Sequence, residues 1–303
     1  MNLRYVVDEQ SSGKTVKFIL KNKLELSERL IKKLKYAGNI FCNSVPVYVN
    51  AMVKTGDMIE VSIDFSREEN DIAPEKMDLD IIYEDDSMIA ISKPSNMVVH
   101  PTSYHQSGTV ANGIVYYMMQ KGVSKKVRPV SRLDRDTSGV IVFAKNAYVQ
   151  ESLVKQMSSG CFKKKYLGVV HGIVSQDEGT INLPIARVPG SIMLRHIHPD
   201  GSPSITHFKV LERLNDATFL EFHLETGRTH QIRVHCQAIG HPLIGDTLYP
   251  GTGSYANSNR SLIERQALHS YSVRFIHPVS KEDISLTAPL PNDMLNLLEI
   301  LRK

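Results

Sequence analysis

The sequence lacks several features that define large classes of proteins. No run approaches the ~18 consecutive apolar residues of a membrane-spanning helix, and the charged N-terminal segment has no apolar signal core. The cysteines Cys42, Cys161 and Cys236 form no CxxC pair, which favours reduced thiols over a disulfide framework. We therefore expect a cytoplasmic protein that is not secreted and has no membrane partner.

Familiar short motifs of nucleotide, hydrolase and metal chemistry are also missing. The sequence contains no P-loop, no GxGxxG and no GxSxG. Its 12 histidines include the pair His196 and His198, but no spacing matches HExxH or a paired Cys/His zinc site. Structural or RNA-facing histidines are the favoured interpretation, and we expect no metal site.

Charge is distributed unevenly along the 303 residues, a length typical of about two domains. Residues 1–57 carry ten Lys or Arg and five Asp or Glu, residues 58–86 carry two and eleven, and residues 87–303 carry 24 and 16. Basic blocks of this kind favour a polyanionic partner. The charged stretch Ser66–Glu75 has a proline and no periodicity, so it predicts a linker, with a surface loop as the alternative.

The first basic block predicts a small domain. Ser27 is placed to cap a helix that Gly38 ends, with Leu30, Ile31 and Leu34 as its apolar stripe. Three lysines fall largely off that stripe: Lys32, Lys33 and Lys35. Short β-like runs follow at residues 39–42, 45–49 and 58–63.

From residue 79 onward, β-like runs dominate. They lie at residues 79–83, 88–91, 140–144, 166–171, 206–211, 219–224 and 268–275. Helical patterns occupy residues 110–118, 147–158, 229–239 and 294–301. Many strands with few helices predict an α+β domain built on an antiparallel or mixed sheet.

The stretch SRLDRDTSG (131–139) is a polar loop between apolar runs, and it holds two Asp and two Arg. A carboxylate beside guanidinium groups stays ionised at neutral pH, because the opposite charge favours the charged form. A positioned, ionised Asp can act as a nucleophile or a general base. On spacing alone, a surface turn with a local salt bridge is the favoured alternative.

Two further stretches carry concentrated positive charge. In TGRTHQIRVH (226–235), a helix beginning near Thr229 would place free N–H groups near an anion, with His230 and Arg233 on one face. Taken alone, the stretch favours the alternative of a basic amphipathic surface helix. In FKKKYL (162–167), three lysines precede a tyrosine suited to base stacking, whereas a lysine-protected edge strand is the alternative.

Taken together, these stretches resemble the RluA family of RNA pseudouridine synthases. The similar blocks, in family order, are IIYEDDSMIAISKPSNMVVHP (81–101), RLDRDTSG (132–139), KKYLGVVHG (164–172), ETGRTHQIRVH (225–235) and HPLIGDTLYP (241–250). The first 62 or so residues resemble an S4-like RNA-binding module. Departures are Ser92, Asn96 and Ser131; the family often has His before RLD, so Ser131 receives no catalytic role.

The resemblance implies a domain order and a fold. We expect an S4-like RNA-binding domain at 1–65, an acidic linker at 66–76 and a catalytic domain at 77–303. The catalytic domain would carry a mixed, mainly antiparallel sheet flanked by helices, preceded by the small α/β module. We expect the protein to act as a monomer.

The resemblance also implies residue roles. Asp134 would be the catalytic aspartate, Tyr166 and Ile232 would line the base pocket, and Arg233 would hold Asp134 ionised. Arg132 would contact the displaced RNA. RNA contacts are predicted from Lys32, Lys33, Lys35, Lys125, Lys126, Arg128, Lys163, Lys164, Lys165, Arg228 and His230.

The activity so implied is isomerisation of a flipped-out uridine in structured RNA to pseudouridine. The reaction consumes nothing and is not an oxidation, so no cofactor is expected. Large-subunit ribosomal RNA is the expected target, with tRNA as the alternative. Two remoter hypotheses are an N-glycosidase using Asp134 and Asp136 as paired carboxylates, and an RNA-binding protein without activity.

Overall fold

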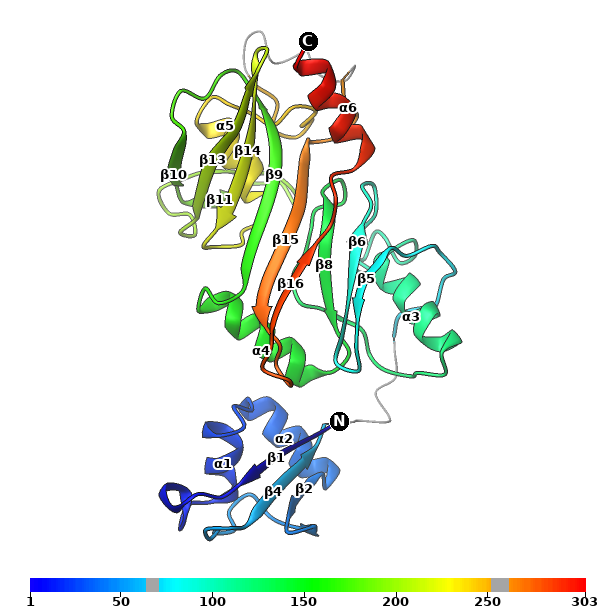
Figure 1. The fold of residues 1–303 in the computed structure, drawn as a ribbon, viewed down its shortest axis with the longest axis vertical. Coiled ribbons are helices and arrows are strands. Elements are labelled where there is room, and N and C mark those ends of the chain that lie inside the picture. The colour runs from blue at the N-terminus through cyan, green and yellow to red at the C-terminus, as the bar shows by residue number, and fades with distance from the viewer. Residues whose placement is uncertain (64–70, 252–261) are drawn as a thin grey trace.

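The computed structural model describes residues 1–63, 71–251 and 262–303 (Figure 1). The first of these ranges forms a four-stranded antiparallel sheet in the order β1-β4-β2-β3. Its elements are β1 (Asn2–Val6), the 3-10 helix η1 (Glu9–Ser11), α1 (Val16–Asn22), α2 (Glu28–Ala37), β2 (Ile40–Cys42), β3 (Val45–Pro46) and β4 (Met58–Ser62).

Helix α2 forms where the sequence predicts it. The Ser27 hydroxyl accepts a hydrogen bond from the Leu30 backbone N–H at 3.1 Å, which satisfies one unpaired donor of the first turn. Gly38 ends the helix in the left-handed region, at φ 68°. Leu30, Ile31 and Leu34 are buried against the sheet, so the cap, the stripe and the stop are all confirmed.

The remaining two ranges build a ten-stranded sheet in which the main order is β10-β13-β14-β9-β15-β8-β6-β5. Strand β16 pairs with β15, β7 pairs with β8, and β15 runs parallel to β8 whereas the other pairs are antiparallel. The strands are β5 (Ile81–Glu84), β6 (Met88–Lys93), β7 (Arg128–Pro129), β8 (Ser138–Ala144), β9 (Lys163–His171), β10 (Glu178–Asn182), β13 (Ile205–Leu214), β14 (Ala217–Leu224), β15 (Leu268–Ile276) and β16 (Asp283–Thr287). The predicted mixed, mainly antiparallel sheet is confirmed.

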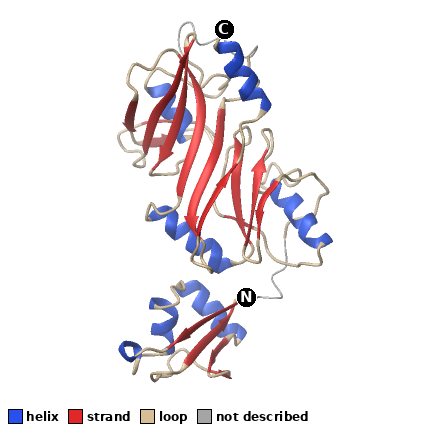
Figure 2. Ribbon diagram, viewed as in Figure 1, coloured by secondary structure: helices blue, strands red, loops and turns tan. Residues whose placement is uncertain are grey.

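Helices flank this sheet near its ends and edges (Figure 2). They are α3 (Val110–Gln120), α4 (Ala147–Ser158), α5 (Gln231–Ala238) and α6 (Asn292–Leu301). A separate hairpin joins β11 (Ile185–Arg187) and β12 (Arg195–Ile197). Apolar side chains of α3 and α5 share one core with β6, β8, β9 and β14, so the sheet holds both helices through hydrophobic contact.

Some elements differ from the sequence prediction. Strand β3 ends at Pro46, short of the predicted residue 49, and helix α5 begins at Gln231 instead of near Thr229. His230 causes the later start, because its φ of 57° lies outside the helical region. Elements β1, α1, β10, β11, β12 and β16 were not predicted; most are short, and several strands have polar, half-exposed sequences with weak periodicity.

The predicted acidic linker 66–76 is described in part. Residues 66–70 lie outside the described residues, and residues 71–76 contain no helix or strand. Ile72 is buried in the core that contains α3, and the Asn112 side chain donates to the Ala73 carbonyl at 2.8 Å. Residues 71–76 therefore pack against α3. None of the helices in the described ranges combines the length and apolar character that crossing a bilayer requires.

Candidate active site

Asp134 begins a tight turn between β7 and β8, closed by a hydrogen bond from the Thr137 N–H to the Asp134 carbonyl at 3.1 Å. We call residues 134–137 the Asp134 turn. Gly139 follows it at φ 110°, and a Cβ there would lie 2.2 Å from the Ser270 carbonyl oxygen. Glycine is therefore required for β15 to approach β8 directly behind the turn.

One side of the Asp134 turn is fixed by a buried lysine that sequence reasoning missed. The Lys93 ammonium donates to the carbonyls of Arg135 at 2.9 Å, Met97 at 2.9 Å and Pro94 at 2.8 Å. Its side chain is 1% exposed, and burial lowers the pKa of Lys93 to about 7. Three short donor contacts at three carbonyls tie the turn to the loop after β6.

The other side of the turn is fixed by Arg265, also missed. Its guanidinium pairs with both carboxylate oxygens of Asp293 on α6, at 2.6 and 2.9 Å. A further nitrogen donates to the carbonyl of Asp136 at 3.2 Å, and the Gln266 amide donates to the Thr137 hydroxyl at 3.2 Å. Residues far apart in sequence thus restrain successive peptide groups of the Asp134 turn.

Arg233 on α5 meets the Asp134 carboxylate. One guanidinium nitrogen lies 3.2 Å from Asp134 Oδ2, while two others hold Asp246 through 2.7 Å bonds. The side chains of Arg233 and Asp246 are 5% and 0% exposed, whereas Asp134 is 26% exposed. Burial opposes the charge of Arg233, but Asp246 and then Asp134 raise its pKa above the ordinary value.

Asp246 was part of a quoted sequence block but received no predicted role. It also accepts hydrogen bonds from the backbone N–H groups of Leu248 and Tyr249, both at 3.0 Å. Four donor contacts satisfy this fully buried carboxylate, so it orients Arg233 without competing for Asp134. The Arg233 guanidinium is therefore fixed by Asp246, and its remaining nitrogen contacts the partly exposed carboxylate of Asp134.

His230 completes this side of the site. Its Nε2 lies 3.9 Å from Asp134 Oδ1, and its Nδ1 is 2.7 Å from the Tyr249 hydroxyl. Burial lowers the pKa of His230, which favours the neutral ring. His230 was predicted as an RNA contact, but its side chain is 11% exposed and faces the carboxylate.

Tyr166 and Ile232 lie in one apolar cluster with Leu133, the residue before Asp134. Their exposed fractions are 6% and 4%. Burial, reinforced by the charge of Asp134, raises the pKa of Tyr166, so the phenol stays neutral. The structure thus brings together Asp134, Arg233, Tyr166 and Ile232, as the family blocks predicted.

The predicted RNA contacts are less uniform. Arg132 is exposed and donates to the Thr229 hydroxyl at 3.5 Å, close to Arg228. The three lysines of β9 do not form one patch: Lys163 is exposed, Lys165 contacts Glu221 at 3.4 Å, and Lys164 lies 5.7 Å from the centre of the Phe162 ring. Burial lowers the pKa of Lys164 to about 8. Strand alternation, which separates neighbouring residues onto two faces, explains the division.

A second basic group contains side chains of α2 and of the segment around β7. Burial lowers the pKa of Lys33 on α2, and the charges of Arg128, Arg29 and Lys126 lower it further. Lys126 contacts Asp71 at 2.9 Å, while Lys125 is half-buried and Lys32 and Lys35 are exposed. Basic side chains from α2 and from β7 therefore lie near one another.

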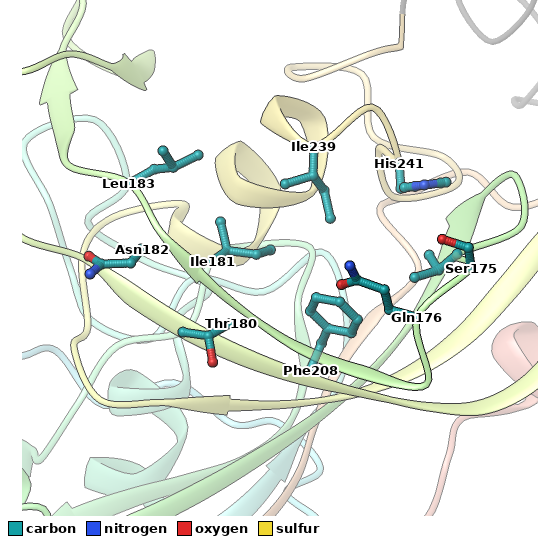
Figure 3. Close-up of a pocket in the computed structure, with 10 residues that line it drawn as sticks. Ser175, Gln176, Thr180, Ile181, Asn182, Leu183, Phe208, Ile239 and His241 are labelled. Carbon is teal, nitrogen blue, oxygen red and sulfur yellow. The ribbon is translucent and has the colours of Figure 1, made fainter.

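In the described part of the chain, the ten-stranded sheet and its flanking elements line two cavities, and the second of them adjoins the site. One of about 490 Å³ lies between β10, β13 and the end of α5, and is lined by Ile181, Phe208, Ile239 and His241 among others (Figure 3). It contains none of the predicted site residues. Another of about 300 Å³ is lined by Arg228 and Thr229, next to His230. Within the described ranges, no three His, Cys, Asp or Glu side chains gather as a metal site would need.

Comparison with known proteins gives a consistent result. A family model described as RNA pseudouridylate synthase matches residues 87–238. The uncharacterized RNA pseudouridine synthase YjbO of Bacillus subtilis is 42% identical over 277 residues, covering 91% of this chain and 95% of that protein. The ribosomal large subunit pseudouridine synthase D of Neisseria meningitidis serogroup B is 40% identical over 271 residues, covering 88% and 72%.

Solved structures show the same fold. Human RNA pseudouridylate synthase domain containing 1 has a TM-score of 0.57 and 25% identity, covering 70% of this chain and 83% of that one. Human RNA pseudouridylate synthase domain containing 4 has a TM-score of 0.60 and 21% identity, covering 73% and 92%.

Proposed function

This chain belongs to the RNA pseudouridylate synthase family, and from that premise we propose that Asp134 is the residue that acts on the target uridine. The family resemblance expected from the motifs is thereby confirmed, and the protein is an RNA pseudouridine synthase. The observation that carries the proposal is the 3.2 Å contact between Asp134 and Arg233, whose orientation Asp246 fixes.

The reaction needs one well-aimed carboxylate. The N1–C1′ bond of uridine breaks, the uracil turns, and a C5–C1′ bond forms, while the C5 proton leaves and N1 gains one. Uracil departs as a delocalised anion, so the pair of carboxylates used in ordinary glycoside hydrolysis is not required. Asp134 serves either by attacking C1′ or by removing the 2′ proton.

The surroundings of Asp134 suit the rest of the reaction. Tyr166 and Ile232 supply buried apolar surface against which a flipped uracil can lie, and this excludes water that would otherwise trap the sugar. The guanidinium of Arg233 contacts one carboxylate oxygen of Asp134 at 3.2 Å and so orients it. Contact with the displaced RNA is the role that we assign to Arg132, which is exposed and lies two residues before Asp134 in sequence.

The test compares two neighbouring carboxylates. Asp134→Asn should keep RNA binding and lose pseudouridine formation, because the amide is neither a nucleophile nor a base. Asp136→Asn is the matched control, since Asp136 pairs with the exposed Arg135 and its carbonyl contact with Arg265 is unaffected. Pseudouridine formation by Asp134→Asn at the wild-type rate would overturn the assignment. Release of free uracil by the wild-type protein would instead favour an N-glycosidase.

We propose large-subunit ribosomal RNA as the substrate. Support comes from relatives named ribosomal large subunit pseudouridine synthase D, which are 37–40% identical to this chain. Mapping pseudouridines in ribosomal RNA and tRNA from cells with and without the protein tests the choice. If cells without the protein lack a pseudouridine in tRNA and in no ribosomal RNA, the substrate is tRNA.

We also propose that residues 1–65 act as an S4-like RNA-binding module ahead of the catalytic domain. The exposed Lys32 and Lys35 on α2, together with Lys33 beside Arg128, support this role. Lys32→Gln/Lys35→Gln should weaken RNA binding and leave the rate at saturating RNA unchanged. The control is Lys17→Gln/Lys21→Gln, because both of those lysines pair with Glu28. Equal effects in both variants would contradict the module's role.

A further inference from the structure

The cavity of about 300 Å³ next to the catalytic side chains is lined by three arginines: Arg187, Arg195 and Arg228. We call it the arginine pocket. One wall is the β11–β12 hairpin, and another is residues 200–202, which pair with Ile185 through hydrogen bonds of 2.9 and 3.0 Å. A Cβ at Gly201 would lie 2.6 Å from the Ile185 backbone, so this close pairing depends on glycine.

Each arginine of the pocket is held by main-chain carbonyls. Arg187 donates to the Ser191 carbonyl at 2.6 Å, and Arg228 donates to the Pro203 carbonyl at 3.3 Å. One nitrogen of Arg195 reaches the carbonyls of residues 192–194 at 2.9 to 3.4 Å. Within the described ranges, none of the three forms a salt bridge with a carboxylate. A neutral carbonyl orients a guanidinium and leaves its full charge in place.

This arrangement differs from that of seven other arginines in the described part of the chain. Carboxylate partners are present for Arg4, Arg135, Arg213, Arg233, Arg265, Arg274 and Arg302. Unneutralised guanidinium groups that share one cavity repel one another, so the cavity has a strong preference for an anion.

One acidic residue lines the same cavity. The Asp200 side chain is 93% exposed, and its carboxylate lies 3.8 Å from the His198 ring. Solvent therefore screens it, and it neutralises none of the three guanidinium groups.

The pocket adjoins the Asp134 site through His230 and Tyr249. Arg228 and Thr229 line it and immediately precede His230, which lies 3.9 Å from Asp134. The Arg195 backbone N–H donates to the Tyr249 hydroxyl at 2.9 Å, and that hydroxyl contacts His230. A ligand in the pocket would thus contact residues directly adjacent in sequence to His230, the neighbour of Asp134.

We infer that the arginine pocket binds a backbone phosphate of the RNA adjacent to the uridine undergoing isomerisation. The inference rests on the proposed function of Asp134 for the position of that uridine. Guanidinium groups match the geometry and charge of phosphate oxygens, and phosphate contacts fix the register of a nucleic acid without reading its sequence. Held in this way, the strand would present one nucleotide to Asp134.

The first experiment uses end-labelled oligouridylate, which does not require the natural target to be known. Arg187→Gln/Arg228→Gln should raise the dissociation constant about tenfold and reduce the salt dependence of log Kd by about one. The matched control Arg274→Gln/Arg302→Gln removes two carboxylate-paired charges elsewhere and should leave both values nearly unchanged. Equal losses in the two variants, or no loss in the first, would overturn the inference.

The second experiment uses the RNA that the wild-type enzyme modifies. A neutral methylphosphonate placed at the phosphate on either side of the target uridine should weaken wild-type binding at one of these positions. In the Arg187→Gln/Arg228→Gln variant, which has already lost the pocket's contact, the same methylphosphonate should cause no further loss of affinity. If enzyme and variant lose affinity equally at every position, the pocket does not bind that phosphate.

The failures of the two proposals are distinguishable. A wild-type enzyme that forms no pseudouridine through Asp134 contradicts the proposed function, whatever the oligouridylate result. An active enzyme whose pocket variant binds oligouridylate with wild-type affinity and salt dependence contradicts the pocket alone.

Discussion

The buried arginines Arg233 and Arg265 are held differently from the pocket arginines Arg187 and Arg228. Arg233 and Arg265 are almost fully buried, and each forms a two-bond pair with an aspartate, Asp246 or Asp293. Arg187 and Arg228 are instead oriented by single carbonyls. The comparison indicates a division of work: neutralised arginines fix the geometry of the protein, and unneutralised ones bind the ligand.

The largest effect that would test this division is expected at Arg233. Arg233→Leu should reduce the rate at saturating RNA by about a hundred- to a thousandfold, since Asp134 loses its positioned counter-charge. It should also lower the free energy of unfolding by about 3–5 kcal/mol, because Asp246 is left buried and unpaired. Single-turnover kinetics and chemical denaturation measure the two effects.

A second variant separates the loss of rate from the loss of stability. Arg233→Leu/Asp246→Leu removes both buried charges and should recover much of the lost stability without recovering the rate. Recovery of the rate in the double variant would show that Arg233 acts through folding alone.

Arg265 should give the next effect. Arg265→Lys keeps the charge but cannot hold both Asp293 oxygens and the Asp136 carbonyl, so the Asp134 turn should loosen. We expect kcat to fall about tenfold to a hundredfold with KM unchanged. Arg274→Lys, at an exposed arginine that also pairs with one aspartate, is the control. A rise in KM instead would place Arg265 among the ligand-binding arginines.

The histidines near these buried groups predict a smaller, pH-dependent effect on stability. Burial lowers the pKa of His230, His235 and His269, so the folded protein resists their protonation. The unfolded chain binds these protons as the pH falls below about 6.5, so the free energy of unfolding should decrease there and be regained above it. Urea denaturation at pH values on both sides measures this, and a shallower dependence is expected for His235→Gln. A stability that rises on acidification would contradict the prediction.

The smallest effect on RNA binding is expected at Asp200, the acidic residue that lines the arginine pocket. Asp200→Asn should tighten oligouridylate binding about twofold at low salt, and the gain should vanish at high salt because the side chain is exposed. Filter binding across a salt series measures it. Weaker binding would mean that Asp200 supports the pocket.

Sequence reasoning predicted the residues that gather around Asp134 better than those that fix the turn which carries it. Asp134, Tyr166, Ile232 and Arg233 come from blocks whose family pattern is strong, and the structure brings them together. Lys93 lies within another quoted block, but its role depends on carbonyls that only the folded loop presents.

Arg265 and Asp293 show why the supporting residues could not be predicted from the sequence. Arg265 is 129 residues from the Asp136 carbonyl that it contacts, and no local periodicity reports such a pairing. The pocket arginines were missed for a related reason, with Arg228 as the exception. The hairpin that carries Arg187 and Arg195 is made of two three-residue strands, which are too short to give a pattern.

The parallel pairing of β15 with β8 has a consequence for biosynthesis. Translation releases the Asp134 turn long before β15, Arg265 and α6, yet these later segments cover the edge of β8 and hold the turn. Until these segments have been synthesised, β8 lacks its β15 partner at Ser138 and Gly139, and the Asp134 turn lacks its contacts with Arg265 and Gln266. The Asp134 turn therefore acquires its full set of contacts only after the segments from Arg265 onward have been synthesised and have folded against it.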